Sequence, residues 1–320
     1  MFVTMRYAVA APALVPRPLH VAAGTCSSGP DLRRPLRFSA SADPGGIAIV
    51  RERWSALGIP APVASARGAA PDVDSAIDRT LPARAYRLIV ARDGIHIAAG
   101  DAEAAFDALA TLAQLPERDA HGWHIACTAI DDRPALRWRI VMDDISRGPF
   151  PTMTYFKTRI RTLAALKING YSPYMEAVFD DPAHPFTAFP EALTAAELHE
   201  LGVYARRFHV ALVPSQQTFA HMHEALKWET LAPLAELPHG YLLAESDPRT
   251  YTYLEPLLRA EIAAAGPSPF FNLNADEPLD LGRGRTPRSA ATFAAHVNRV
   301  ADVVAARGER PMIWDDAIQA

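Results

Sequence analysis

Carboxylate and amide side chains recur in the second half of the sequence, each set directly after a short apolar segment. They are Asp143 and Asp144, Glu176, Gln216, Gln217 and His221, Asp276 and Glu277, and Asp315 and Asp316. Carboxylates dominate these sets and lysines are few. Such a composition suits a site that binds sugar hydroxyls and transfers protons, and it suits a phosphate site badly.

Five apolar segments predict the strands that carry these residues: 138–142, 168–174, 210–214, 270–274 and 312–314. Helices are predicted between them at 152–167, 195–207, 251–264 and 289–307. The second helix has one apolar face at helical spacing, made of Leu198, Leu201, Ala205 and Phe208. Strands that alternate with helices indicate a parallel sheet. No glycine-rich phosphate loop follows the first strand, which favours a (β/α) barrel over a dinucleotide-binding sheet.

The predicted fold class is therefore α/β, a (β/α)8 TIM-type barrel preceded by a small α/β domain. A barrel of this type needs about eight strands, and we find about five before the sequence ends at Ala320. We expect a barrel that is incomplete, in a chain that is truncated after the fifth strand. The expected boundaries are 1–14 for an N-terminal tail, 15–130 for the small domain and 131–320 for the partial barrel.

The small domain shows a hairpin followed by a helix. Residues 85–90 alternate in polarity as a half-buried strand does, Asp93-Gly94 is a turn signal, and 95–99 form the returning strand. Asp101 is expected to cap a helix that Pro116 closes. The segment 40–82 is rich in Ala, Pro and Ser, and it predicts no particular element.

Charge, apolar run length and cysteine content give expectations about the partners, the location and the cysteine chemistry of the protein. The net charge of −4 is spread without long like-charge runs, which argues against nucleic acid or an anionic membrane as partner. No apolar run approaches the length of a membrane span. Without a supported signal peptide, a bacterial cytoplasmic location is the default, and export stays open. Cys26 and Cys127 are expected to be ordinary buried or half-buried residues, not a disulfide framework or a metal site.

Four stretches resemble motifs of the family 20 glycoside hydrolases, the β-N-acetylhexosaminidases. They are 136–147, with its Asp-x-Ser-Arg ending, 166–169 followed by 174–176, 272–277, and 311–316. Residues 217–221 resemble the Gln-Thr-x-x-His loop that ends the third strand in bacterial members. The sequence departs from the family pattern at Ile140 and at Asn274-Ala275, where glycines are usual.

The resemblance implies an exo-acting enzyme that removes terminal β-linked N-acetylglucosamine or N-acetylgalactosamine from a small molecule or glycan, without a cofactor or metal. Two adjacent carboxylates cannot flank a sugar, and family members use the 2-acetamido oxygen of the substrate as the nucleophile. By resemblance, Glu277 is the general acid and base, and Asp276 orients the acetamido group. The substrate-binding residues that it implies are Arg139, which would clamp the outer hydroxyls, His221, Glu176, Trp314 and Asp315.

Other interpretations of the same residues stay open. Asp276 and Glu277 could belong to a solvated loop, and Arg139 could form an ion pair with Asp143 or Asp144. The chain could be an inactive truncated homologue, or a protein that only binds amino sugars. It could also be a metal-dependent barrel hydrolase that uses His221 together with the histidine two positions later, although side chains at that spacing point apart.

Overall fold

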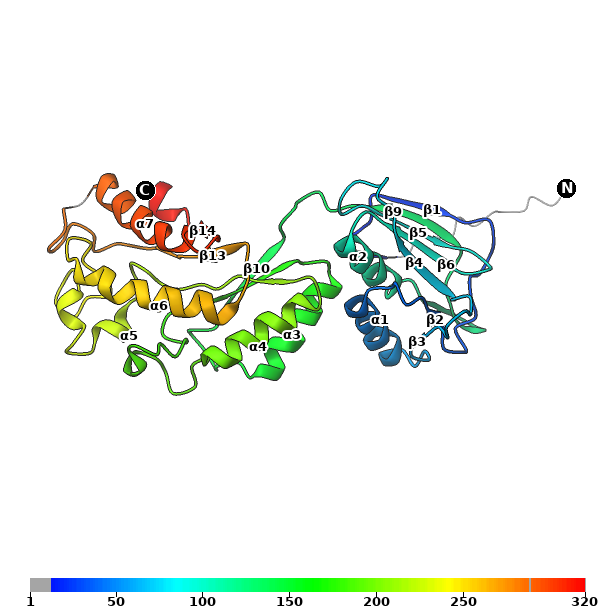
Figure 1. Ribbon diagram of the computed structural model, residues 1–320, viewed down its shortest axis with the longest axis horizontal. Coiled ribbons are helices and arrows are strands. Elements are labelled where there is room, and N and C mark those ends of the chain that lie inside the picture. The colour runs from blue at the N-terminus through cyan, green and yellow to red at the C-terminus, as the bar shows by residue number, and fades with distance from the viewer. Residues whose placement is uncertain (1–12, 288, 320) are drawn as a thin grey trace. The chain divides into compact units, whose positions relative to one another are not determined.

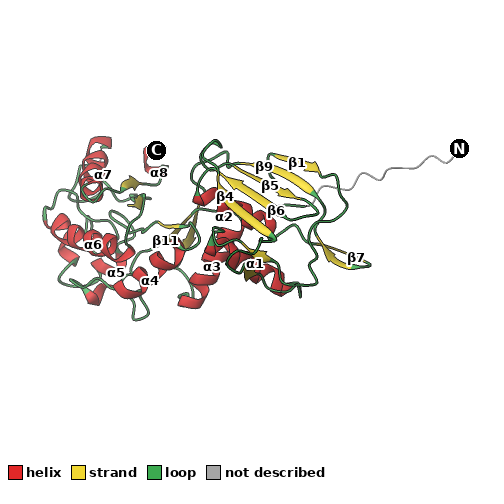
Figure 2. Cartoon of the chain, turned by 45° about the vertical axis from the view of Figure 1, so that its right-hand side comes forward, coloured by secondary structure: helices red, strands yellow, loops and turns green. Residues whose placement is uncertain are grey.

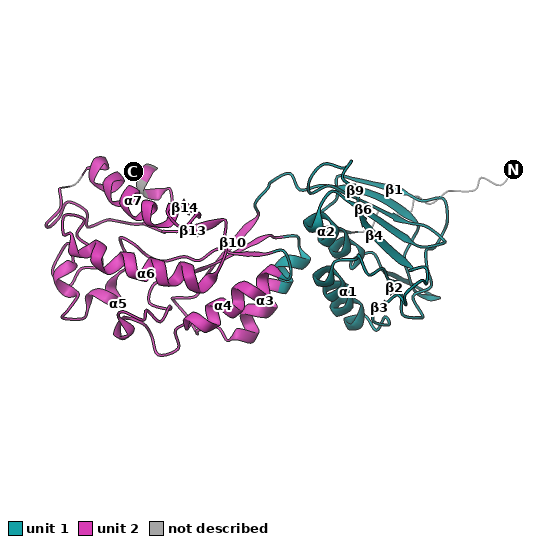
Figure 3. Cartoon of the chain, viewed as in Figure 1, with its two compact units in different colours: residues 1–138, 161–167, 207–209 teal, residues 139–160, 168–206, 210–320 magenta. Residues whose placement is uncertain are grey.

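The structure is a computed structural model that describes residues 13–287 and 289–319. The chain divides into two compact units, coloured separately in Figure 3. The first unit consists of the described residues up to 138 together with 161–167 and 207–209. The second consists of 139–160, 168–206 and the described residues from 210 onward.

A seven-stranded mixed sheet forms the first unit, in the order β1-β9-β5-β6-β4-β2-β3 (Figure 2). Its strands are β1 (His20–Ala23), β2 (Arg37–Phe38), β3 (Val63–Ala64), β4 (Val73–Ile77), β5 (Tyr86–Val90), β6 (Ile95–Ala99) and β9 (Thr128–Asp132). A separate hairpin is formed by β7 (Glu117–Asp119) and β8 (Gly122–His124). Helix α2 (Ala102–Leu112) packs on β4, β5 and β6, and α1 (Pro44–Ala56) packs on α2.

The predicted hairpin and helix cap of the first unit are confirmed. Strands β5 and β6 pair antiparallel, and inward and outward residues alternate along β5. The Asp101 side chain accepts a hydrogen bond from the backbone N–H of Ala104 at 2.8 Å and so caps α2. Helix α1 lies in the segment for which the sequence predicted no element. Its start is nevertheless marked locally, because Asp43 caps it and Pro44 occupies its first turn.

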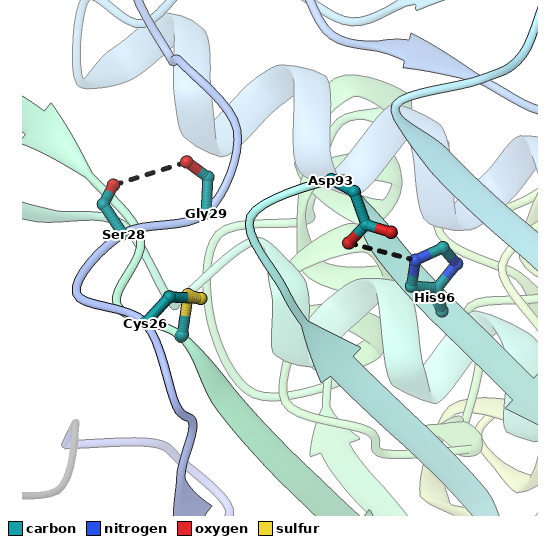
Figure 4. Close-up of a disulfide and its surroundings, with 6 residues drawn as sticks. Cys26, Ser28, Gly29, Asp93 and His96 are labelled. Carbon is teal, nitrogen blue, oxygen red and sulfur yellow. Dashed lines mark hydrogen bonds and ion pairs between the residues drawn. A yellow bond between two sulfur atoms is a disulfide. The ribbon is translucent and has the colours of Figure 1, made fainter.

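Cys26 and Cys127 form a disulfide, so the expectation of two ordinary thiols is wrong (Figure 4). Strand β1 pairs antiparallel with β9, and the N–H of Gly24 donates to the carbonyl of Cys127 at 2.7 Å. This pairing brings the two cysteine Cα atoms within 5.4 Å although 101 residues separate them in sequence. No local sequence pattern predicts a strand pairing over such a distance, so the sequence alone did not predict the disulfide.

Replacing either cysteine by serine should destabilise the first unit. A disulfide restricts the unfolded chain, and for a closed loop of about 100 residues its removal costs up to about 4.7 kcal/mol of stability. Calorimetry of the full chain without reductant should show Cys26→Ser, Cys127→Ser and the double variant with the same lowered unfolding temperature. Reductant should lower the unfolding temperature of the parent protein to that same value. A double variant whose loss is the sum of the two single losses would show that the side chains stabilise the unit separately, not as a disulfide.

The second unit alternates strands with helices along its length (Figure 1). Its strands are β10 (Ile140–Asp144), β11 (Gly170–Tyr174), β12 (Ala211–Leu212), β13 (Phe270–Asn272) and β14 (Arg310–Met312). Its helices are α3 (Met153–Ala165), whose last turn belongs to the first unit, α4 (Ala195–Arg206), α5 (His223–Leu226), α6 (Arg249–Ala265), α7 (Ala290–Ala305) and α8 (Asp316–Gln319). Short 3₁₀ turns occur at Pro185–Thr187 and Ala232–Leu234. All five predicted strands and all four predicted helices of this half are present, with ends shifted by a few residues.

The strands of the second unit pair parallel and in chain order. Strand β10 pairs with β11, β11 with β12, and β13 with β14. An isolated parallel bridge between Ser215 and Asn272 connects the segment after β12 to β13. The predicted parallel arrangement is confirmed, and the order has no reversal of the kind that marks a dinucleotide-binding sheet. Among the described residues β14 does not pair with β10, so the strands form an open series and not a closed barrel.

Strand β14 lies two residues earlier than the sequence predicted. Pro311 lacks a backbone N–H, which is unfavourable inside a central strand. In the described part of the chain, however, β14 is the last strand of the series, and an edge strand needs donors on one side only. The backbone N–H of Trp314 still donates to the carbonyl of Asn274 at 3.0 Å, which ties the ends of the two strand segments together.

Candidate functional site

The carboxyl ends of the parallel strands border a cleft of about 650 Å³, a size within the usual range for small-molecule sites. Its walls are formed by Met142, Asp144, Arg147, Tyr174, His221, Asp276, Glu277 and Trp314. Four of the five strand ends contribute to this lining, because parallel strands end on the same edge of the sheet. The third contributes through the loop after β12.

The backbone after β13 takes a left-handed course that separates two adjacent carboxylates. Asn274, Ala275 and Glu277 have φ values of 56°, 59° and 47°, a region that residues other than glycine rarely adopt. The side-chain amide of Asn274 donates to Ser215 Oγ at 3.0 Å and helps to hold this shape. Asn274 and Ala275 are the positions where the resembling motifs have glycines. Non-glycine residues in this region are strained, and such strain is found most often where function requires it.

Asp276 is the less exposed member of the carboxylate pair, and it is half-buried. Its side chain is 16% exposed, whereas that of Glu277 is 60% exposed. The amide of Gln217 donates to Asp276 Oδ1 at 2.9 Å. Burial raises the pKa of Asp276, but its interactions with His221 and Gln217 outweigh burial and hold this pKa below the usual value. Asp276 is therefore ionised at neutral pH.

His221 lies among three carboxylates. Its Nε2 is 3.4 Å from Asp276 Oδ2 and 3.2 Å from Glu277 Oε2. Its Nδ1 is 3.7 Å from Glu176 Oε1. The interaction with Asp276 raises the pKa of His221, in opposition to burial, which lowers it. The Nε2 atom of the imidazole therefore lies within reach of the negative charge on both carboxylates of the pair.

Arg147 joins the first two strand ends. One guanidinium nitrogen donates to Asp144 Oδ2 at 2.8 Å and another to Glu176 Oε1 at 2.6 Å. The guanidinium also lies over the ring of Tyr174, 5.2 Å from its centroid. Burial raises the pKa of Glu176, and Arg147 offsets part of that increase. Arg147 therefore fixes the position of Glu176 beside His221.

Three side chains of this cluster were missing from the predicted site: Arg147, Tyr174 and Gln217. Signals for two of them are present in the sequence. Arg147 ends the Asp-x-Ser-Arg motif, and Gln217 begins the Gln-Thr-x-x-His loop. Tyr174 hydrogen-bonds with Gln217 and is the last residue of a wholly buried strand, so its polar contact is evident only in the fold.

The other predicted site residues lie in different places. Trp314 lines the cleft and is 40% exposed, so it is not a core residue. Asp315 is exposed and is not part of the cleft wall, whereas the next residue, Asp316, accepts from the backbone N–H of Glu277 at 2.9 Å. Arg139 precedes β10, at the opposite end of that strand from Asp144, and it does not line the cleft. The substrate-binding roles of these residues stay predictions.

The carboxylates at the end of β10 have partners of their own. Asp143 accepts from Arg159 at 3.3 Å and from the Tyr171 hydroxyl at 3.2 Å. Asp144 accepts from the backbone N–H of Ser146 at 2.9 Å as well as from Arg147. These contacts hold the turn after the strand in place.

The histidine pair of the metal-dependent alternative is not brought together at the cleft. His223 is exposed at the start of α5 and does not line the cleft. His221 instead forms a group with Asp276 and Glu277 whose potential ligand atoms lie within 4.8 Å of one another. Any metal at this site would therefore use the carboxylate pair and not the second histidine.

Comparison with known proteins shows what the chain is similar to. The model for "Glycosyl hydrolase family 20, domain 2" matches residues 11–133. Bovine (Bos taurus) hexosaminidase D is 26% identical over 201 residues, which are 57% of this chain and 56% of that protein. These matches support membership of glycoside hydrolase family 20 and bear out the family resemblance of the sequence motifs.

Solved family 20 structures share the fold of this chain. The exo-β-N-acetylglucosaminidase of Vibrio harveyi, solved with N-acetylglucosamine, has a TM-score of 0.79 at 22% identity and covers 96% of this chain and 55% of its own. The chitobiase of Flavobacterium johnsoniae has a TM-score of 0.81 at 20% identity, with coverages of 95% and 52%. The α/β fold class is confirmed by these similarities. This chain spans about half the length of the relatives that it matches.

Proposed function

We propose that this family 20 chain carries the acid–base machinery of an exo-acting β-N-acetylhexosaminidase. The observation that supports the proposal most is the arrangement of Asp276 and Glu277 around His221 at the end of β13. One carboxylate is half-buried and held ionised, and its neighbour is exposed in the same cleft. That difference of environment suits one orienting carboxylate and one proton-transferring carboxylate.

In the proposed reaction the substrate supplies its own nucleophile. Ionised Asp276 accepts the N–H of the 2-acetamido group and stabilises the positive charge that develops on it. The acetamido oxygen forms a bond to the anomeric carbon while the glycosidic C–O bond breaks, and Glu277 gives its proton to the departing oxygen. Glu277 then takes a proton from water, whose oxygen adds to the anomeric carbon as the bond from that carbon to the acetamido oxygen breaks, with net retention.

Surrounding residues would position these two carboxylates. His221 contacts both of them, and Arg147 holds Glu176 against the other side of the imidazole. Trp314 lines the cleft and is a further proposed sugar contact, whereas Arg139 and Asp315 lie outside the cleft lining and have no part in the proposed reaction. The strand order also supports a (β/α) barrel architecture, because barrel strands pair parallel with their sequence neighbours.

We also propose that the protein works in an oxidising compartment, which differs from the default location. Disulfides form and persist in exported proteins and are rare in the cytoplasm of mesophiles, and the first unit contains one. None of the helices in the described part of the chain combines the length and apolar character that a membrane crossing requires.

The test compares two aryl glycosides that differ only at the 2-position. We expect the full chain to hydrolyse 4-nitrophenyl N-acetyl-β-glucosaminide and not 4-nitrophenyl β-glucoside, because the second lacks the acetamido nucleophile. Equal turnover of both would contradict substrate assistance. Binding of N-acetylglucosamine without turnover would support the amino-sugar-binding alternative.

A chelator separates the proposal from a metal-dependent hydrolase. Incubation with EDTA should leave the rate of the full chain undiminished, since no step of the proposed reaction uses a metal. The measurement is the initial rate before and after EDTA and then with added Zn²⁺. Activity that EDTA abolishes and Zn²⁺ restores would favour the metal-dependent hydrolase instead.

A further inference from the structure

The three groups at the end of β13 have a ligand geometry that acid–base catalysis does not require. The Nε2 of His221 is close enough to both carboxylates for a hydrogen bond, at 3.4 Å and 3.2 Å, yet it is buried and forms a well-aligned bond with neither. Ligand atoms around a tetrahedral zinc ion, about 2.0–2.1 Å from the metal, lie about 3.3 Å from each other. The two distances from His221 match this spacing, and the ligand atoms of all three side chains lie within 4.8 Å of one another.

The charge and access of the cluster also suit a cation. Three carboxylates line the cleft, those of Asp144, Asp276 and Glu277, and that of Glu176 lies 3.7 Å from His221 Nδ1, so the carboxylates outnumber the guanidinium of Arg147 among the described residues here. Glu277 is exposed to the cleft, so a fourth coordination position would be open to water, as it is in metal sites that are not fully enclosed by protein. One imidazole and two carboxylates favour Zn²⁺ over Mg²⁺ or Ca²⁺, which prefer ligand sets made of oxygen only.

We propose that His221, Asp276 and Glu277 form a site for Zn²⁺, or a divalent ion of similar chemistry, at which the bound ion inhibits the enzyme. The inference rests on the proposed function, because it is the roles of the two carboxylates that make the ion inhibitory. A metal on Glu277 removes the oxygen that must carry a proton. A metal on Asp276 occupies the oxygen that must accept the acetamido N–H. Binding of the ion and binding of a productive substrate then exclude each other.

The experiment measures binding and turnover separately on the full chain. Calorimetric titration with Zn²⁺ alone should show a site that Mg²⁺ does not fill, and added Zn²⁺ should lower turnover of the aryl N-acetylglucosaminide until EDTA restores it. His221→Gln removes one ligand and should weaken Zn²⁺ binding at this site by roughly tenfold or more. His223→Gln is the matched control, because this exposed histidine lies two residues away and outside the cleft. Its Zn²⁺ affinity and inhibition should match those of the parent protein.

Three results would overturn the site. Unchanged Zn²⁺ affinity in His221→Gln would show that the ion binds elsewhere. Zn²⁺ that binds without lowering turnover would show that the ion is not inhibitory. Zn²⁺ that raises turnover would show that the ion activates the enzyme. If the chain shows no turnover at all, the proposed function fails independently. The site is then judged by calorimetry alone, through the contrast between His221→Gln and His223→Gln.

Discussion

Glu277→Gln should lower kcat for N-acetyl-β-glucosaminides with alkyl or sugar leaving groups by about 10²–10⁴-fold, the usual contribution of a positioned general acid. Glutamine keeps the size of the side chain and cannot give a proton to the leaving oxygen. Activated aryl glycosides need less protonation, so the variant should keep part of its activity on them. The measurement is kcat on both substrate classes.

Glu229→Gln provides the control for this variant, because Glu229 is exposed and lies outside the cleft. It should match the parent protein on both classes of leaving group. A Glu277→Gln variant that loses activity equally on both classes would remove Glu277 from the general acid role. The proposed mechanism would then need another proton donor.

Asp276→Asn should lower kcat by about 10²–10³-fold for alkyl and aryl leaving groups alike. The negative charge of Asp276 is needed for the acetamido group in both cases, whatever group leaves. An equal loss of kcat on both classes of leaving group would distinguish the role of Asp276 from that of Glu277. A variant that discriminates between leaving groups as Glu277→Gln does would contradict the assignment of the two roles. Asp302→Asn, at an exposed position on α7, is the control for the loss of one carboxylate.

The same variant has a consequence for pH. The interaction with Asp276 raises the pKa of His221 above its usual value, so an anion at Asp276 favours the charged imidazole. Asp276→Asn removes that anion and should lower the pKa of His221. The imidazolium would then lose its proton at lower pH than in the parent protein. An NMR titration of the histidine ring follows this directly, and an unchanged His221 pKa would show that the two side chains do not interact in solution.

Much of the second unit was evident in the sequence because its signals are local. Each strand is a short apolar segment, each helix has an apolar face, and Asp276 and Glu277 directly follow one of the strands. Parallel strands bring such residues to one edge regardless of the details of packing. The cleft lined by His221, Asp276 and Glu277 therefore followed from strand order.

The sequence predicted less well where long-range pairing decides the outcome. The disulfide depends on β1 lying against β9, and the position of β14 depends on its pairing with β13. Arg139 matches a family motif, yet the structure places it at the end of β10 away from the cleft. Sequence similarity identifies residue types in order, and it does not give the direction in which each strand presents them.

Local sequence patterns were enough to predict the α/β class, the alternation of strands and helices in the second half, and which carboxylates follow which strand. The half-buried position of Asp276, the exposure of Glu277 and the contact of His221 with both are evident only in the folded chain. Burial and charge depend on contacts between segments far apart in the chain, and a local pattern does not contain those contacts. The left-handed turn at Asn274 and Ala275 and the hydrogen bond from Gln217 arise from such contacts, and they give two neighbouring carboxylates different environments.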